Sequence, residues 1–169
     1  PVLEASLAMN LRYWSHAEEV IMNTKGNLAN CLNQLGRHDE AIVLYREVYA
    51  KLAMHGITET SLFVISNVII SSVNQGHYAE ARSMLREQLP NANQLVGPAH
   101  TITHSLRRQE AIIAVQDPAA SREDVLRAEK TGEELVTNAR RVLGPLHPET
   151  QTDEAWLMDA RKKLHEGGL

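Results

Sequence analysis

The sequence has few residues of the kinds that cross-link a chain or span a membrane. Cys31 is its single cysteine, so no disulfide forms within the chain, and this favours a reducing compartment. We therefore expect a cytoplasmic protein. No apolar run approaches the length that crosses a bilayer, and no signal-peptide pattern opens the chain, so we predict no membrane partner.

Aromatic residues are scarce as well. They make up 4% of the sequence, which leaves leucine, isoleucine, valine and alanine to build the core. Glycine and proline are sparse, with nine glycines and six prolines in 169 residues, and this favours helices over many short strands. Because the chain begins at Pro1 and not at methionine, we expect it to be a piece of a longer protein.

Positive charge and catalytic motifs are also missing. The net charge of −4 argues against a nucleic-acid partner bound through a general basic face. No glycine-rich phosphate loop or nucleophile elbow appears, so we predict no catalytic residues and no cofactor. His100 and His104 have a spacing that suits a metal, but no third ligand accompanies them, and we predict no metal site. We expect Cys31 to be buried and inert.

Two stretches of the sequence recur at fixed intervals. The segment "LGRHDEAIVLYREV" (35–48) matches "QGHYAEARSMLREQ" (75–88), forty residues later. A second pair is "VGPAHTIT" (96–103) and "LGPLHPET" (143–150), which are 47 residues apart. Intervals in this range are typical of solenoids built from stacked helix pairs.

Each repeat unit reads as a helix A followed by a helix B. Apolar spacing and the breaks at glycine predict helices at about 18–35 and 38–54, 59–75 and 78–95, and 100–116 and 121–143, with a closing helix at 148–165. Ser121 and Asp124 form a predicted capping box at the start of the third B helix. The connection before that helix is about five residues longer than its counterparts.

The predicted fold is therefore all-α: an α-solenoid of antiparallel helix pairs, with about three repeats and partial units at the ends. We expect one repeat domain over residues 1–169. It divides into a partial unit at 1–17, repeats at about 18–55, 56–97 and 98–144, and a closing helix at 145–169.

The spacing of small and large residues resembles the tetratricopeptide repeat. A glycine, four residues, an alanine and then a large residue occur as Gly36, Ala41 and Tyr45 and again forty residues later. The segments "GNLANCLNQLGRHDEAIVLYREV" and "RRVLGPLHPET" are similar to repeats of the kinesin light chains, and the likeness covers roughly residues 23–165. The resemblance implies a right-handed superhelix whose A helices line a concave groove that holds peptides.

The first A helix carries an unusual set of side-chain amides. Four of them fall within an arc of roughly 60°, although asparagine is a mediocre helix former. The leucines at 28, 32 and 35 lie on the opposite side. The repeat interval aligns Asn27 with Asn67 and Gln109, and it aligns Gln34 with Asn74 and Gln116. Arg108 adds a cation beside this set.

An amide offers both a donor and an acceptor, which suits the backbone of an extended peptide. In the family resembled, asparagines of the A helices hold the peptide backbone, and Asn27 and Asn67 match those positions. We predict a non-enzymatic module that binds a peptide segment of a partner protein. The predicted peptide-binding residues are Asn23, Asn27, Asn30, Gln34, Asn67, Asn74, Arg108, Gln109 and Gln116.

Other readings of the same residues stay open. The amides could be solvated, or they could bridge neighbouring A helices. The chain could be a structural scaffold that self-associates through its solenoid ends, or a regulatory repeat domain of a larger protein. We predict a monomer or a weak homo-oligomer.

Overall fold

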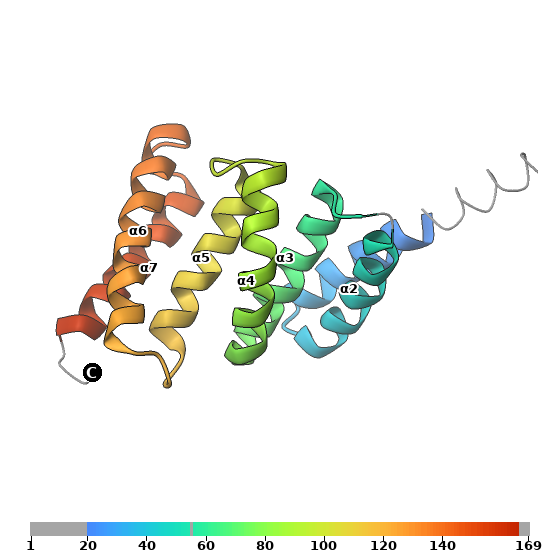
Figure 1. The fold of residues 1–169 in the computed structure, drawn as a ribbon, viewed down its shortest axis with the longest axis horizontal. Coiled ribbons are helices and arrows are strands. Elements are labelled where there is room, and N and C mark those ends of the chain that lie inside the picture. The colour runs from blue at the N-terminus through green and yellow to red at the C-terminus, as the bar shows by residue number, and fades with distance from the viewer. Residues whose placement is uncertain (1–19, 55, 166–169) are drawn as a thin grey trace, which may run out of the picture. The chain divides into compact units, whose positions relative to one another are not determined.

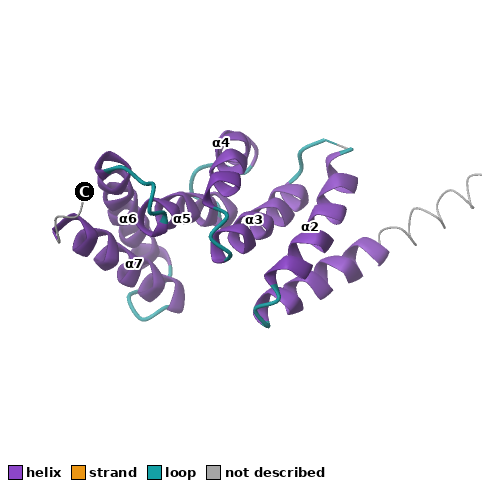
Figure 2. Ribbon diagram, turned by 90° about the horizontal axis from the view of Figure 1, so that it is seen from below, coloured by secondary structure: helices purple, strands orange, loops and turns teal. Residues whose placement is uncertain are grey.

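The computed structural model describes residues 20–54 and 56–165, and in these ranges the chain forms helices and no strands. The helices follow one another along the chain and are joined by short connections (Figures 1 and 2). None of the described helices is both long and apolar enough to cross a membrane. The all-α prediction is confirmed, and so is the succession of adjacent helix pairs.

The chain divides into two compact units, with the boundary between Ser71 and Ser72. The described part of the first unit contains helical residues 20–34, α2 (His38–Ala53) and most of α3 (Glu59–Asn74). Its core is aliphatic except for one tyrosine, and its fully buried members include Ala29, Ala41, Tyr45, Leu62, Val68 and Ile69. Helical residues 20–34 and α3 are the A helices of this unit, and α2 is the B helix.

The second unit contains α4 (Tyr78–Leu95), α5 (Thr101–Gln116), α6 (Arg122–Val142) and α7 (Pro148–His165). Here α5 packs between α4 and α6, and α7 packs against α6 and α5. By the same naming α5 is an A helix and α4 and α6 are B helices. The most deeply buried large side chains of this unit are Leu106, Ile113, Val125 and Leu135.

The predicted bounds of α2 to α7 agree with the structure to within one residue. Local chemistry explains this agreement. Gly36 and Gly76 end their helices with φ of 74° and 76°, a left-handed conformation that glycine adopts without strain. The capping box is confirmed, because Ser121 Oγ accepts from the Asp124 backbone N–H while the Asp124 carboxylate accepts from the Ser121 backbone N–H.

Two predictions are not tested. The partial unit at 1–17 lies outside the described residues. That all 169 residues form a single repeat domain, with repeat limits near 55 and 97, stays a prediction.

Candidate functional site

The amides of helical residues 20–34 divide into an exposed set and an inward-facing set. Asn23, Asn27 and Gln34 are exposed, and their side chains form no hydrogen bond with other described residues. The buried side of the helix is centred on Ala29 and Leu32. This side is rotated from the one predicted, since Leu28 and Leu35 are exposed to solvent by 51% and 72%.

Asn30 faces the second helix of its own pair. The Tyr45 hydroxyl donates a hydrogen bond of 2.5 Å to Asn30 Oδ1. Tyr45 is 1% exposed, and its burial, helped by the nearby Cys31, raises the pKa of its hydroxyl to about 12. The Asn30 carbonyl therefore links the two helices of the first pair.

Asn33, which was not among the predicted site residues, has a similar role between A helices. Its Oδ1 accepts a hydrogen bond of 3.0 Å from the Ser71 hydroxyl of α3 and lies 2.6 Å from Nδ1 of His38 in α2. One amide oxygen thus connects three helices of the first unit. The alternative in which amides bridge A helices is realised at this residue.

The other predicted amide of the first unit is Asn67 of α3. Asn67 is partly buried, and its side-chain nitrogen Nδ2 is enclosed and has no hydrogen-bond partner among the described residues. On the same helix Phe63 is half exposed. A buried amide N–H without an acceptor destabilises a protein by about 1–3 kcal/mol, so a hydrogen bond to Asn67 Nδ2 would be stabilising.

In the second unit, Asn74 and Gln116 are exposed, and neither side chain forms a hydrogen bond with a described residue. Gln109 of α5 is only 7% exposed. In this unit too, some of the predicted amides are accessible to a ligand, namely Asn74 and Gln116, and one, Gln109, is buried.

Arg108 is engaged inside the second unit. Its Nε donates to Asp153 Oδ1 at 2.5 Å and a terminal nitrogen donates to Oδ2 at 3.3 Å, so the guanidinium grips the carboxylate with two bonds. Asp153 belongs to α7 and is 1% exposed. His104 lies beside the pair, with Nε2 at 3.6 Å from Asp153. This cluster fastens α5 to α7.

The imidazoles at 100 and 104 have different surroundings. His100 is the N-cap of α5, and its Nδ1 accepts from the Ile102 backbone N–H. His104 belongs to the Arg108–Asp153 cluster. Over the described residues, no group of three or more His, Cys, Asp or Glu side chains is arranged to hold a metal ion.

A comparison with protein-family models matches residues 21–52 to the family described as tetratricopeptide repeat. Residues 21–52 are therefore similar to a tetratricopeptide repeat. The match covers the first helix pair and confirms the resemblance there, which is to the kinesin light chain type. No curated protein matches the chain. Tetratricopeptide repeats are generally protein–protein interaction modules and are typically not catalytic.

Within residues 21–52, the prediction for Cys31 is wrong. Cys31 is exposed and not buried. It follows Asn27 by one turn of the helix and so shares the solvent side, which leaves the inward side to Ala29 and Leu32. The apolar character of cysteine misled the expectation, because residue type gives no information on helix rotation.

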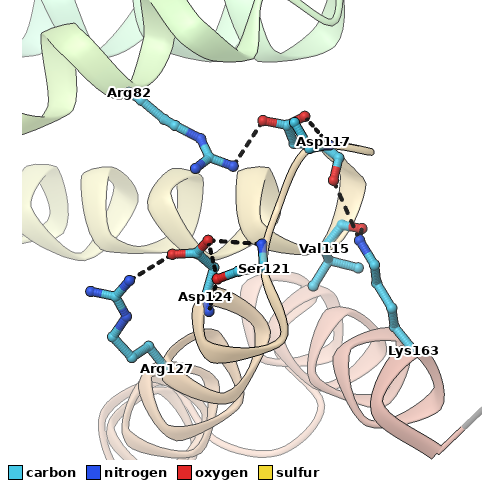
Figure 3. Close-up of polar contacts among 8 residues, drawn as sticks. Arg82, Val115, Asp117, Ser121, Asp124, Arg127 and Lys163 are labelled. Carbon is cyan, nitrogen blue, oxygen red and sulfur yellow. Dashed lines mark hydrogen bonds and ion pairs between the residues drawn. The ribbon is translucent and has the colours of Figure 1, made fainter. Parts of the chain in front are cut away.

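The long connection after α5 is fixed by two other helices (Figure 3). Arg82 of α4 forms an ion pair of 2.8 Å with Asp117, and Lys163 of α7 donates to the Val115 carbonyl at 2.7 Å. Asp117 Oδ1 accepts from the Ala119 backbone N–H at 2.8 Å. Asp117 of the connection is therefore paired with α4, and Lys163 of α7 bonds to the end of α5 and, at 3.5 Å, to the Asp117 carbonyl.

Trp156 is packed inside the last pair of helices. It is 8% exposed and lies in a cluster of alanines and aliphatic residues from α5, α6 and α7. Gly132 of α6 leaves room for its ring, because a Cβ there would stand 2.6 Å from Trp156 Cζ3. A glycine inside a helix is the signal by which the sequence could have revealed this contact.

Proposed function

We propose that the exposed amides of the A helices bind an extended peptide segment of a partner protein. One observation supports this above the others: Asn23, Asn27 and Gln34 share one solvent-facing side and are not used within the described structure. Asn30 and Asn33 differ from them, because their side-chain oxygens accept hydrogen bonds from Tyr45 and Ser71 and so hold helices together. The free amides are the ones left for another chain.

In this proposal the first unit supplies backbone donors and acceptors from Asn23, Asn27 and Gln34. On α3, Asn67 is partly exposed, and the half-exposed Phe63 adds an apolar contact for a side chain of the peptide. In the second unit, Asn74 and Gln116 present amides of the same kind. We assign Asn30 and Arg108 to the framework, and a ligand would reach little of Gln109.

The proposed module is non-enzymatic and binds without a cofactor. Its single cysteine fits a cytoplasmic location, as the composition predicts. The partner is a protein, recognised through main-chain amides that every sequence offers, so affinity is spread over several contacts of about 1 kcal/mol each.

The experiment is selection from a random peptide library displayed on phage, followed by affinity measurement for the selected peptides. The test variant carries Asn27→Ala and Gln34→Ala. The control carries Gln94→Ala and Gln151→Ala, two exposed amides of α4 and α7 with no side-chain bond to a described residue. We expect the test variant to bind at least roughly tenfold more weakly and the control to bind as the wild type does.

Equal affinities for the two variants would show that the exposed amides are only solvated. Circular dichroism of both variants separates this outcome from a loss of helix. N-methylation of the peptide backbone provides a second readout. It removes the N–H groups that would donate hydrogen bonds to the Asn and Gln side-chain oxygens of the protein.

A second candidate function is self-association. Helical residues 20–34 and the turn after them expose the apolar side chains of Val20, Ile21, Leu28 and Leu35, each by about half or more. Exposed apolar groups of this kind mark interaction surfaces. Light scattering over a concentration series tests it: a mass that rises with concentration, and is restored to the monomer value by Leu28→Asp, supports a homo-oligomer.

A further inference from the structure

A small pocket opens at one end of the second unit, where the start of α5, the end of α6 and the start of α7 lie together (Figure 1). Its volume is about 140 Å³. Pockets that enclose a drug-sized molecule measure about 300–1,000 Å³, so this one is of a size for one side chain of a partner protein. We call it the end pocket.

The end pocket has an apolar rim that is open to solvent. Val142 and Leu143 line it, and they are exposed by 72% and 41%. Exposed apolar groups beside a polar pocket are typical of interaction surfaces. The aliphatic stem of a long side chain can pack on such a rim while its polar end reaches inward. The rim therefore favours a long side chain with a polar end.

The positive charge in the lining is already neutralised. Of the described residues that line the end pocket, Arg108 is the only arginine or lysine. Both oxygens of Asp153 accept hydrogen bonds from its guanidinium, and the Asp153 side chain is 1% exposed. An anionic ligand would have to compete with this buried carboxylate. The end pocket therefore does not favour an anion.

The unpaired side chains of the lining carry oxygen acceptors. They are the carboxylate of Glu149, the amide of Asn138 and the hydroxyls of Thr101 and Ser105, and none of these side chains forms a hydrogen bond with a described residue. Amide and hydroxyl oxygens accept hydrogen bonds as a carboxylate does. The available groups are thus several acceptors around one negative charge.

The helix ends around the pocket are consistent with this. α6 ends there, and the last carbonyls of a helix carry partial negative charge. α5 and α7 begin there, but an imidazole caps each of them. His100 Nδ1 accepts from the Ile102 backbone N–H at 3.3 Å. His147 Nδ1 accepts from the Glu149 backbone N–H at 3.2 Å. These bonds occupy N–H groups that would otherwise attract an anion.

We propose that the end pocket binds an arginine side chain of a partner protein. A guanidinium has five N–H donors, no acceptor and a permanent positive charge, which complements a carboxylate surrounded by further acceptors. In this arrangement the guanidinium bonds to Glu149 and Asn138, and its methylene groups lie on the apolar rim. The proposal goes beyond the amide site, because neither residue is among the proposed peptide contacts.

The test uses the isotope-labelled whole chain and two-dimensional NMR, which detects weak binding. The probes are the Nα-acetyl amides of arginine, citrulline and glutamate, together with free arginine. Citrulline has nearly the shape of arginine but is neutral, and glutamate is an anion. We expect the capped arginine to bind at least roughly fivefold more tightly than capped citrulline or glutamate. The shifts should concentrate at backbone amides of residues 99–108 and 138–149.

Two matched variants test the carboxylate. Glu149→Gln removes the charge in the pocket, and Glu123→Gln makes the same change at an exposed, unpaired residue of α6 outside it. Each glutamate is the second residue of its helix, so the loss of a first-turn charge is common to both variants. We expect Glu149→Gln to weaken binding of capped arginine at least roughly fivefold, and Glu123→Gln to change it less than twofold. The spectra also show whether each variant keeps its fold.

A gain of binding provides an independent check. Asn138→Asp adds a second carboxylate to the pocket and should strengthen binding of capped arginine severalfold. Gln94→Glu, at an exposed site of α4 outside the pocket, should not. Asn27→Ala with Gln34→Ala should leave this binding unchanged. A failure of the end pocket is therefore distinguishable from a failure of the amide site.

Four results would overturn the proposal. The first is equal binding of capped arginine and capped citrulline, or no binding of either. The second is equal affinities for Glu149→Gln and Glu123→Gln. Tighter binding of the glutamate probe would show an anion site at Arg108. Tighter binding of free arginine than of its capped form would show a site for a free amino acid and not for a partner's side chain.

Discussion

Asn27 and Asn30 lie roughly 60° apart around one helix, and their surroundings differ completely. The Asn27 side chain faces solvent and forms no hydrogen bond with a described residue, whereas Asn30 Oδ1 accepts a hydrogen bond from the buried Tyr45 hydroxyl. The same side chain thus serves the fold at one position and is available for a ligand at the other. Helix rotation decides between these roles, and rotation is set by which neighbours are buried.

The Tyr45–Asn30 hydrogen bond has a measurable alkaline signature. Because burial raises the pKa of Tyr45 to about 12, its hydroxyl binds a proton more tightly in the folded chain than in the unfolded one. The free energy of unfolding should therefore be unaffected by this group below about pH 10, the ordinary tyrosine value, and should fall as the pH rises from there toward 12.

Urea unfolding of the wild type and Tyr45→Phe at several alkaline pH values checks this. The wild type should lose stability relative to the variant over that interval. A constant difference between them would contradict the raised pKa.

Substitution of Gly132 by alanine should destabilise the core of the second unit, because Gly132 lies directly against Trp156. In Gly132→Ala the added methyl would meet the Trp156 ring, which costs about 1–3 kcal/mol in a packed core. Gly26→Ala is the matched control, since nothing lies within 4 Å of its Cβ position. Alanine there should stabilise the helix by about 0.5–1 kcal/mol. Thermal unfolding followed by circular dichroism should show shifts of opposite sign, and shifts of the same sign would contradict this packing.

At the scale of elements, the helices were predictable because their limits are local. Glycines with positive φ and the Ser121–Asp124 box act within a few residues of the helix ends they define. The partner of Arg108 was not predictable in this way. Asp153 lies 45 residues further along the chain, and its contact depends on how α5 and α7 pack. The exposure of Cys31 and Leu28 was missed for the same reason, since spacing gives the sides of a helix but not which side is covered.

The α5–α7 connection should be sensitive to loss of its carboxylate. Asp153→Ala would leave Arg108, of which 14% is exposed, as an uncompensated charge, and the expected loss of stability is about 3–5 kcal/mol. The control is Glu154→Ala, because Glu154 pairs with Arg140 at the exposed surface, where such a pair contributes about 0–1 kcal/mol. Urea unfolding of both variants measures the difference. Similar small losses would show that the buried pair contributes no more than the exposed one.

At the scale of the whole molecule, the proposed peptide site is neutral, because it consists of the side-chain amides of Asn23, Asn27 and Gln34. Salt screens charge–charge attraction over a distance of about 10 Å at 0.1 M, and it has little effect on hydrogen bonds between neutral amides. Peptides selected on these amides should therefore bind with nearly constant affinity as sodium chloride is raised. Anisotropy titrations at several salt concentrations check this, and a steep decline in affinity would contradict recognition by neutral amides.

The enclosed Trp156 gives the second unit an optical signal of its own. The chain has two tryptophans, and Trp14 lies outside the described residues. In a Trp14→Phe background, intrinsic emission would come from the ring that fills the space beside Gly132. Its wavelength would follow the hydration of the α6–α7 interface alone, and helical circular dichroism would follow the entire chain. Comparing the two signals during denaturation would show whether the two compact units open together or in sequence.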